Sequence, residues 1–313
     1  MPIAAYLVAL HSSLQHEVLH GHPTRSSLLN EALIYLPLTL AIPFRRFKTT
    51  HLRHHRDTVL TDPYDDPESW YWAEGDWRRA PRAVRWIFAL NATLAGRLVL
   101  GPILGVAGLW RNDLRVLLSE PDSREADLIR DAYAHHAAGV ALVLILVWGV
   151  FGVSPLVYLL LAAWPGMALL MVRTFAEHRA VPEVGERTVI VEAEPLFALL
   201  FLNNNLHAVH HTHPTEPWYR LPSLYRAQKA EILAANGGYF FPGYRAVAAR
   251  WLLNARDSVV HPFYRRRHDR DASDVRLAGD PAADRPVLDS LGLGAGGEGA
   301  SGTGSSLARD GSV

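Results

Sequence analysis

Histidine is the residue type that stands out in this chain, because it makes up 16 of the 313 residues. Eight histidines fall into three short boxes: His16 and His20 in HEVLH, His51, His54 and His55 in HLRHH, and His207, His210 and His211 in HAVHH. On a helix, residues three and four positions apart share one face. We therefore expect each box to direct its imidazoles at one point. Neutral imidazole is a common metal ligand, so the pattern predicts a metal site.

The number of histidines indicates two metal ions. A catalytic zinc ion needs about three protein ligands and one open position, and eight histidines are too many for that. Two ions with about four imidazoles each, and open positions besides, match the count. Imidazole suits iron, copper, nickel and zinc alike, so ligand type leaves the metal open. The chain has no cysteine, which excludes iron–sulfur clusters, thiolate catalysis and cysteine zinc sites.

HEVLH also matches the H-E-x-x-H motif of zinc proteases. Such a protease needs a further ligand, and Asn30-Glu31 lies only 11 residues after His20. In the extended form of the motif a glycine is required where this chain has Pro23. A protease would also leave HLRHH and HAVHH without a role. A membrane zinc protease is therefore the remote alternative.

Two apolar runs predict a membrane hairpin. Residues 137–153 and 156–172 contain no charged side chain and are separated by Ser-Pro. Each is near the lower limit of the roughly 20 residues that cross a bilayer. Residues 28–44 and 84–110 are also apolar, but prolines or charges interrupt them, and we expect interfacial or half-inserted helices. The hairpin begins and ends on one side, so boxes before and after it can meet.

The whole chain is predicted to be an all-α integral membrane protein. Residues 1–268 form one membrane domain, and residues 269–313 are a Gly/Ser/Ala-rich tail that we expect to be disordered. Basic clusters at residues 45–48 and 78–85 mark the cytoplasmic side. The net charge of +0 gives no field for nucleic acid.

HEVLH, HLRHH and HAVHH, in this order around a membrane hairpin, resemble the histidine boxes of the membrane fatty-acid desaturase superfamily. The superfamily includes related hydroxylases and carotenoid ketolases, and the resemblance covers residues 9–225. It implies a non-haem di-iron centre that uses O2 on the cytoplasmic face of a bacterial inner membrane. It also implies a ninth ligand after the hairpin, for which His178 has the right position.

Relatives usually have a transmembrane pair before the first box, whereas residues 2–10 provide at most half a span. We expect a product translated from further upstream to be more active.

Several other residues are candidates for supporting the metal site. Glu17, Asp57 and Glu177 each lie close to a box histidine or to His178 in the sequence, and we expect them to accept an imidazole N–H. Asn204 precedes the third box and is a candidate to hold a metal-bound water. A solvent-exposed acid is the plain alternative for each carboxylate.

The acidic stretch at residues 61–69 is expected to be a polar turn, because its prolines break the spacing of a calcium loop. Trp70, Tyr71, Trp72, Trp77 and Trp218-Tyr219 are expected at the membrane interface or around a substrate entrance.

The predicted function is the introduction of a double bond into a fatty acyl chain. A hydroxylase or ketolase acting on a carotenoid, an alkane or another lipid is the alternative, and a lipid-binding protein without catalysis is a third. The sequence has no flavin fingerprint and no His-Pro-Gly-Gly motif of a fused cytochrome b5. A ferredoxin or cytochrome b5 with its reductase is therefore the implied electron donor.

The seven remaining histidines are not expected to bind metal: His11, His22, His135, His136, His213, His261 and His268.

Overall fold

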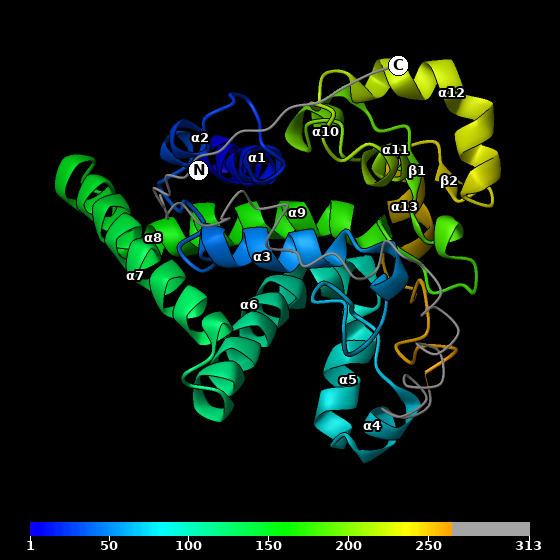
Figure 1. Ribbon diagram of the computed structural model, residues 1–313, viewed down its shortest axis with the longest axis horizontal. Coiled ribbons are helices and arrows are strands. Elements are labelled where there is room, and N and C mark those ends of the chain that lie inside the picture. Colours follow the sequence, from blue (N-terminus) through cyan, green and yellow to red (C-terminus); the bar gives the residue numbers. More distant parts are fainter. Residues whose placement is uncertain (265–313) are drawn as a thin grey trace, which may run out of the picture.

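The computed structural model describes residues 1–264 and consists mainly of helices, which confirms the predicted class (Figure 1). The predicted tail at residues 269–313 and His268 lie outside the described residues. A two-stranded parallel sheet, which the sequence did not indicate, pairs β1 (Ile190–Val191) with β2 (Phe240–Phe241). The fold is thus a set of helices with one small sheet beside the third histidine box.

The first half of the described chain contains seven α-helices and two short turns of other helix types. Their bounds are α1 Pro2–Leu19, α2 Ser27–Leu33, α3 Phe44–His54, a 3-10 turn at Asp57–Val59, α4 Glu74–Arg79, α5 Arg82–Asn91, α6 Leu94–Ser119, α7 Arg124–Leu144 and a π-helical turn at Ile145–Val150. Capping explains several of these starts. The side chains of Ser26, Thr93 and Ser123 accept hydrogen bonds from the first turns of α2, α6 and α7.

The second half of the described chain contains six α-helices, two short turns of other helix types and the two strands. Its elements are α8 Pro155–Tyr158, a π-helical turn at Leu159–Ala163, α9 Trp164–Ala176, a 3-10 turn at Val184–Arg187, β1, α10 Pro195–Leu200, α11 His207–Thr212, α12 Leu221–Ala235, β2 and α13 Tyr244–Trp251. Pro155 and Pro195 occupy the first helical position of α8 and α10, where the missing N–H costs nothing.

Three helices are long and apolar enough to cross a membrane: Leu94–Ser119, Arg124–Val150 and Pro155–Ala176. The second and third correspond to the predicted hairpin. The first, α6, corrects the predicted bounds of the half-inserted helix at residues 84–110. A break after Asn91 separates α5 from α6, and α6 continues nine residues beyond Trp110 to Ser119, which gives it the length of a span. Residues 28–44 contain only α2 and a non-helical segment before α3.

The positions of the histidines limit how many of these helices cross. His54 precedes all three and His178 follows them, yet their Nε2 atoms lie 2.9 Å apart. The chain between them must therefore cross the bilayer an even number of times. Helix α6 has the lowest hydropathy of the three, and it carries the buried, charged residues Arg97 and Asp113. We infer that the hairpin crosses and that α6 does not cross completely.

Close packing of three helices sets the position of the site. Helix α1 packs against both α9 and α3. A Cβ atom on Gly166 of α9 would lie 2.6 Å from Val8 Cγ1, so glycine permits the close approach of α1. On the other side, Arg46 of α3 forms a buried ion pair with Asp113 of α6, at 2.6 Å. The second box is thereby tied to α6.

The small sheet positions the third box. Val191 N donates a hydrogen bond to Asn205 O at 2.9 Å, and Ala208 N donates to Val189 O at 3.0 Å. These bonds attach the start of α11 to the strand that follows His178. Ile190, Val191 and Val209 are fully buried here, so apolar packing accompanies the hydrogen bonds.

The absence of cysteine makes the membrane topology directly testable. Single cysteines replacing Asp122, between α6 and α7, and Val153, at the tip of the hairpin, should label from opposite sides of the membrane with a membrane-impermeant maleimide. Asp122→Cys should label from the side that carries the histidine boxes, for which Arg56→Cys serves as the reference. Labelling of Asp122→Cys from the side opposite to Arg56→Cys would refute the inference that α6 does not cross.

Candidate metal centre

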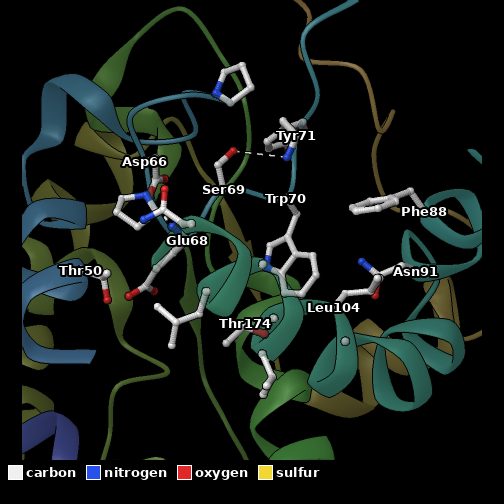
Figure 2. A pocket seen from close by; sticks show the side chains of 18 of the residues that line it. Thr50, Asp66, Glu68, Ser69, Trp70, Tyr71, Phe88, Asn91, Leu104 and Thr174 are labelled. Atoms are coloured by element: carbon white, nitrogen blue, oxygen red, sulfur yellow. Dashed lines mark hydrogen bonds between the residues drawn. The ribbon is translucent and has the colours of Figure 1, made fainter. Parts of the chain in front are cut away.

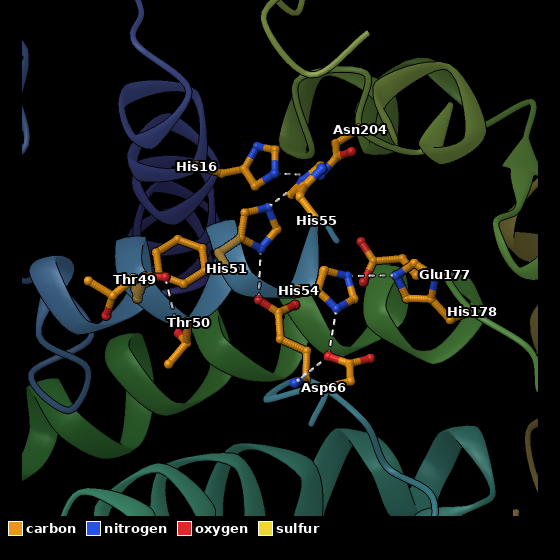
Figure 3. A network of polar contacts seen from close by, with 12 residues as sticks. His16, Thr49, Thr50, His51, His54, His55, Asp66, Glu177, His178 and Asn204 are labelled. Atoms are coloured by element: carbon orange, nitrogen blue, oxygen red, sulfur yellow. Dashed lines mark hydrogen bonds and ion pairs between the residues drawn. The ribbon is translucent and has the colours of Figure 1, made fainter. Parts of the chain in front are cut away.

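Nine histidines from four segments form two neighbouring groups, and Figure 3 labels five of them. The first group contains five residues: His16, His20, His51, His55 and His210. The second group contains four: His54, His178, His207 and His211. Within each group one nitrogen atom per residue lies within 4.8 Å of all the others. The structure thus brings together all nine histidines that the sequence analysis selected.

The second and third boxes each divide between the two groups, which corrects the expectation that a box points at one place. In α3, His51 and His55 belong to the five-histidine group and His54 to the other. In α11, His207 and His211 belong to the four-histidine group, and His210 belongs to the first. Successive helical residues are about 100° apart around the axis, so neighbours such as His54 and His55 cannot point at one ion. The spacing H-x-x-H-H therefore places the i, i+4 pair in one group and the remaining histidine in the other.

The distances between ring nitrogens fit bound metal ions. His54 Nε2 and His207 Nε2 lie 2.9 and 3.0 Å from His178 Nε2, and His51 Nε2 and His210 Nε2 lie 2.9 and 3.0 Å from His55 Nε2. Two nitrogens at about 2.1 Å from one ion and at right angles to each other are about 3.0 Å apart. In addition, His20 Nε2 is buried and has no hydrogen-bond partner among the described residues. Ring nitrogens that converge in this way can hold a metal ion between them.

Burial keeps most of these imidazoles neutral. Burial lowers the pKa of His51, His178, His207 and His210 well below the usual value. Positive charge on neighbouring histidines lowers it further. Neutral imidazole is the form that binds metal. His54 differs, because Asp66 and Glu68 outweigh the effect of burial and raise its pKa to about 9. Without metal, His54 therefore carries a proton at neutral pH.

Two acids that the sequence analysis assigned to a polar turn orient the second box. Glu68 Oε1 lies 2.7 Å from His51 Nδ1, and Asp66 Oδ1 lies 2.8 Å from His54 Nδ1 (Figure 3). A carboxylate at Nδ1 holds the proton there and leaves the Nε2 lone pair free for metal. Asp66 also accepts hydrogen bonds from Thr61 N and Glu68 N, which folds the turn back onto α3. The run of acids directly after HLRHH was the available signal for this role.

The supporting residues selected from the sequence have different surroundings. Asn204 Oδ1 lies 3.0 Å from His207 Nδ1 and can accept a hydrogen bond from it. Glu177 forms an ion pair with Arg173 at 2.8 Å and lies 3.6 Å from His207 Nδ1.

Glu17 Oε2 accepts a hydrogen bond from Trp218 N at 3.0 Å, whereas its Oε1 is 3.9 Å from His16 Nδ1 and beyond hydrogen-bond range. Glu17 therefore links α1 to the segment after the third box. The side chain of Asp57 lies outside what the structure describes.

The other described histidines lie outside both groups. His136 and His261 contact Leu40 O and Thr61 Oγ1, respectively, and His135 contacts Asp131 and Arg45. His213 follows α11 as its C-terminal cap, and His22 precedes a proline. Their predicted lack of a ligand role is in keeping with these positions.

A cavity of about 1440 Å³ reaches the site between α3, α6, α9 and the turn at residues 61–73. Its lining includes His178, Glu68 and Asp66 at the histidine groups, and Met167, Leu170, Met171 and Leu104 along its walls. Trp70, Tyr71 and Trp72 also line it, as does Thr174 (Figure 2). The predicted substrate-entrance role for the aromatic residues at 70–72 agrees with this position, whereas Trp218 and Tyr219 are not among the lining residues. The apolar part of this wall can accommodate a lipid chain beside the histidine groups.

Removal of the Glu68 carboxylate should weaken metal binding. We expect Glu68→Gln to lower metal affinity by about 10- to 100-fold, because an amide holds the His51 proton less firmly than a carboxylate does. Anaerobic titration of the full chain with Fe²⁺ measures the change. Asp65→Asn is the matched control, since Asp65 lies in the same turn and pairs with Arg53 instead. Equal affinities for Glu68→Gln and wild type would contradict the assigned role.

Binding of metal to the four-histidine group should release a proton from His54. Because the pKa of His54 is raised to about 9, protons compete with metal below that pH. The apparent affinity of this group should rise by up to about tenfold per pH unit between pH 7 and 9. Calorimetric titration in two buffers of different ionisation enthalpy counts the protons released. Asp66→Asn should lower the pKa of His54 and remove this dependence. An unchanged dependence in that variant would show that Asp66 does not raise the pKa of His54.

Comparison with known proteins agrees with this geometry. No individually curated protein matches the chain. The sequence profile described as fatty acid desaturase matches residues 1–243, which include all nine histidines, both acids at the second box and the hairpin. The chain therefore belongs to the fatty acid desaturase family.

Proposed function

We propose that this protein is an O2-dependent di-iron oxidoreductase that introduces a double bond into a fatty acyl chain. The observation that carries the proposal is the presence of two adjacent all-histidine groups, one of which, through His178, lines a cavity with an apolar wall. Family membership supports an oxidoreductase with a lipid substrate. The histidines of the two groups are the proposed metal ligands, five for one ion and four for the other.

Iron is the proposed metal because the family typically holds a di-iron centre and the donor set suits it. When bound, two iron ions would supply the means to oxidise an unactivated C–H bond with O2 as co-substrate. Zinc has no such redox chemistry. A zinc protease is also disfavoured, because His16 and His20 share their group with three further histidines and Glu17 is held by Trp218 N.

The protein's own residues have three tasks in this reaction. Glu68 and Asp66 keep the protons of His51 and His54 on Nδ1, so that Nε2 faces the metal. Burial of the histidines excludes bulk water and protects a reactive centre. Met167, Leu170 and Met171 on α9 provide an apolar wall against which an alkyl chain can lie on its way to His178.

Electrons are proposed to come from an external donor, a ferredoxin or a cytochrome b5 with its reductase. We further propose that the protein resides in a bacterial inner membrane with the metal centre facing the cytoplasm. Exposed arginines at residues 78, 79 and 82, close to the cavity mouth, support this orientation under the positive-inside rule. Residues 1–268 are proposed to form a single domain.

The activity can be tested in a bacterial host that has few unsaturated lipids. The full chain is co-expressed with a redox partner, and total fatty acids are analysed by mass spectrometry with double bonds located by derivatisation. Wild type should produce a new alkene. His211→Ala should abolish the product, because it removes a proposed ligand of the four-histidine group. His213→Ala, two residues later and outside both groups, should retain activity.

The product distinguishes the alternatives. A new hydroxy acid, absent from the His211→Ala strain, would assign the protein to the hydroxylase branch. An unchanged lipid profile from membrane-inserted protein that contains two irons would refute the acyl-lipid proposal, and carotenoids would be tested next.

A further inference from the structure

Arg97 is a buried arginine in the cavity wall that forms no ion pair with a carboxylate in the part of the chain that the structure describes. Its side chain is only 7 % exposed. Nε donates a hydrogen bond to Asn91 O at 3.1 Å, and the guanidinium stacks over the Trp70 ring at 3.9 Å. Its NH1 atom is buried and has no hydrogen-bond partner among the described residues. An unpaired buried charge is unfavourable and is rarely retained without a partner or ligand.

The acids near the cavity already have other partners. Asp257 pairs with Arg256 and accepts a hydrogen bond from Tyr71. Glu177 pairs with Arg173. Glu68 and Asp66 contact the histidines of the second box. Within residues 1–264, none of these acids forms an ion pair with Arg97.

The surroundings of Arg97 indicate a built site. Trp70 points into the cavity between Leu104 and Thr174, with the turn that carries Glu68 on one side (Figure 2). A Cβ atom on Gly101 would lie 2.9 Å from Arg97 Cδ and 2.7 Å from Met171 Sδ, so glycine makes room for the stem of the arginine between α6 and α9. The guanidinium also lies 5.9 Å from the Phe175 ring, one helical turn before His178. The charge is thus held in place, inside the cavity, near the histidine groups.

We propose that Arg97, stacked on Trp70, binds the anionic head group of the lipid substrate, a carboxylate or a phosphate. A planar guanidinium with a free N–H suits an oxyanion. The alkyl chain would then lie along the apolar wall of α9. The identity of the chain as substrate rests on the proposed function, whereas the recognition of an anion rests on Arg97 alone.

The test compares ligands that differ only in their head group. Iron-loaded full-length protein in nanodiscs is titrated at pH 8 with palmitate, methyl palmitate and hexadecyl phosphate, each displacing a fluorescent fatty acid. Wild type should bind one of the two anions at least about tenfold more tightly than the ester, as expected from one charge-assisted hydrogen bond. Tighter binding of palmitate identifies a carboxylate ligand, and tighter binding of hexadecyl phosphate identifies a phosphate. Equal binding of anions and ester by wild type would overturn the proposal, whether or not any variant folds.

Variants of Arg97 assign the preference to this residue. Arg97→Gln should lose about tenfold in affinity for the preferred anion and leave the ester within about twofold. Arg97→Lys keeps the charge without the planar stack and should retain part of the preference. Arg124→Gln removes an exposed arginine at the start of α7 that does not line the cavity, and should behave as wild type. An equal loss for anion and ester in Arg97→Gln, with iron content unchanged, would show that Arg97 only shapes the cavity and would overturn the proposal.

The result is independent of catalysis. Binding requires no turnover, so a protein that forms no alkene can still prefer an anion. Conversely, a protein without this preference can still desaturate a neutral lipid. Failure of one proposal therefore leaves the other intact.

Discussion

The relative position of the two histidine groups depends on a helix geometry that α3 and α11 share. Each helix carries H-x-x-H-H and contributes ligands to both groups, with the i, i+4 pair on one side and the third histidine on the other. The separation between the groups is therefore determined by the fixed rise and rotation per residue of these two α-helices. Helix α1 and the segment at His178 complete one group each. A shift of α3 or α11 would disturb both groups at once.

This arrangement requires polar groups inside an otherwise apolar region, and each must be satisfied. Asp66 illustrates how this is done, because one carboxylate contacts His54 Nδ1 and two backbone N–H groups of its own turn. Arg46 and Asp113 form a buried pair that joins the second box to α6. Such pairs are costly to break, since removal of one partner leaves a buried charge. The site is held by a connected network of these contacts.

Much of this architecture follows from the sequence, because its signals are local. The boxes are visible from spacing within five residues, and the hairpin from two uninterrupted apolar runs. The role of Glu68 was missed because it depends on a turn that brings residue 68 back to residue 51, which no local pattern specifies. The length of α6 was underestimated because Arg111 and Asp113 resemble the end of an apolar segment, whereas Asp113 is paired with Arg46 inside the protein. The division of each box between two groups, and the stacking of Arg97 on Trp70, likewise depend on tertiary contacts.

The distribution of ligands along the chain has a consequence for biogenesis. HEVLH and HLRHH emerge from the ribosome early, but neither group is complete at that stage, since His210 belongs to the first and His207 and His211 to the second. The hairpin must be inserted, and the small sheet must capture α11, before the last imidazoles arrive. Metal loading is therefore a late event in the maturation of this protein. Until then, nascent chains expose a cluster of strong ligands to whichever metal is available, so the supply of metal ions at the membrane helps to decide which metal is bound.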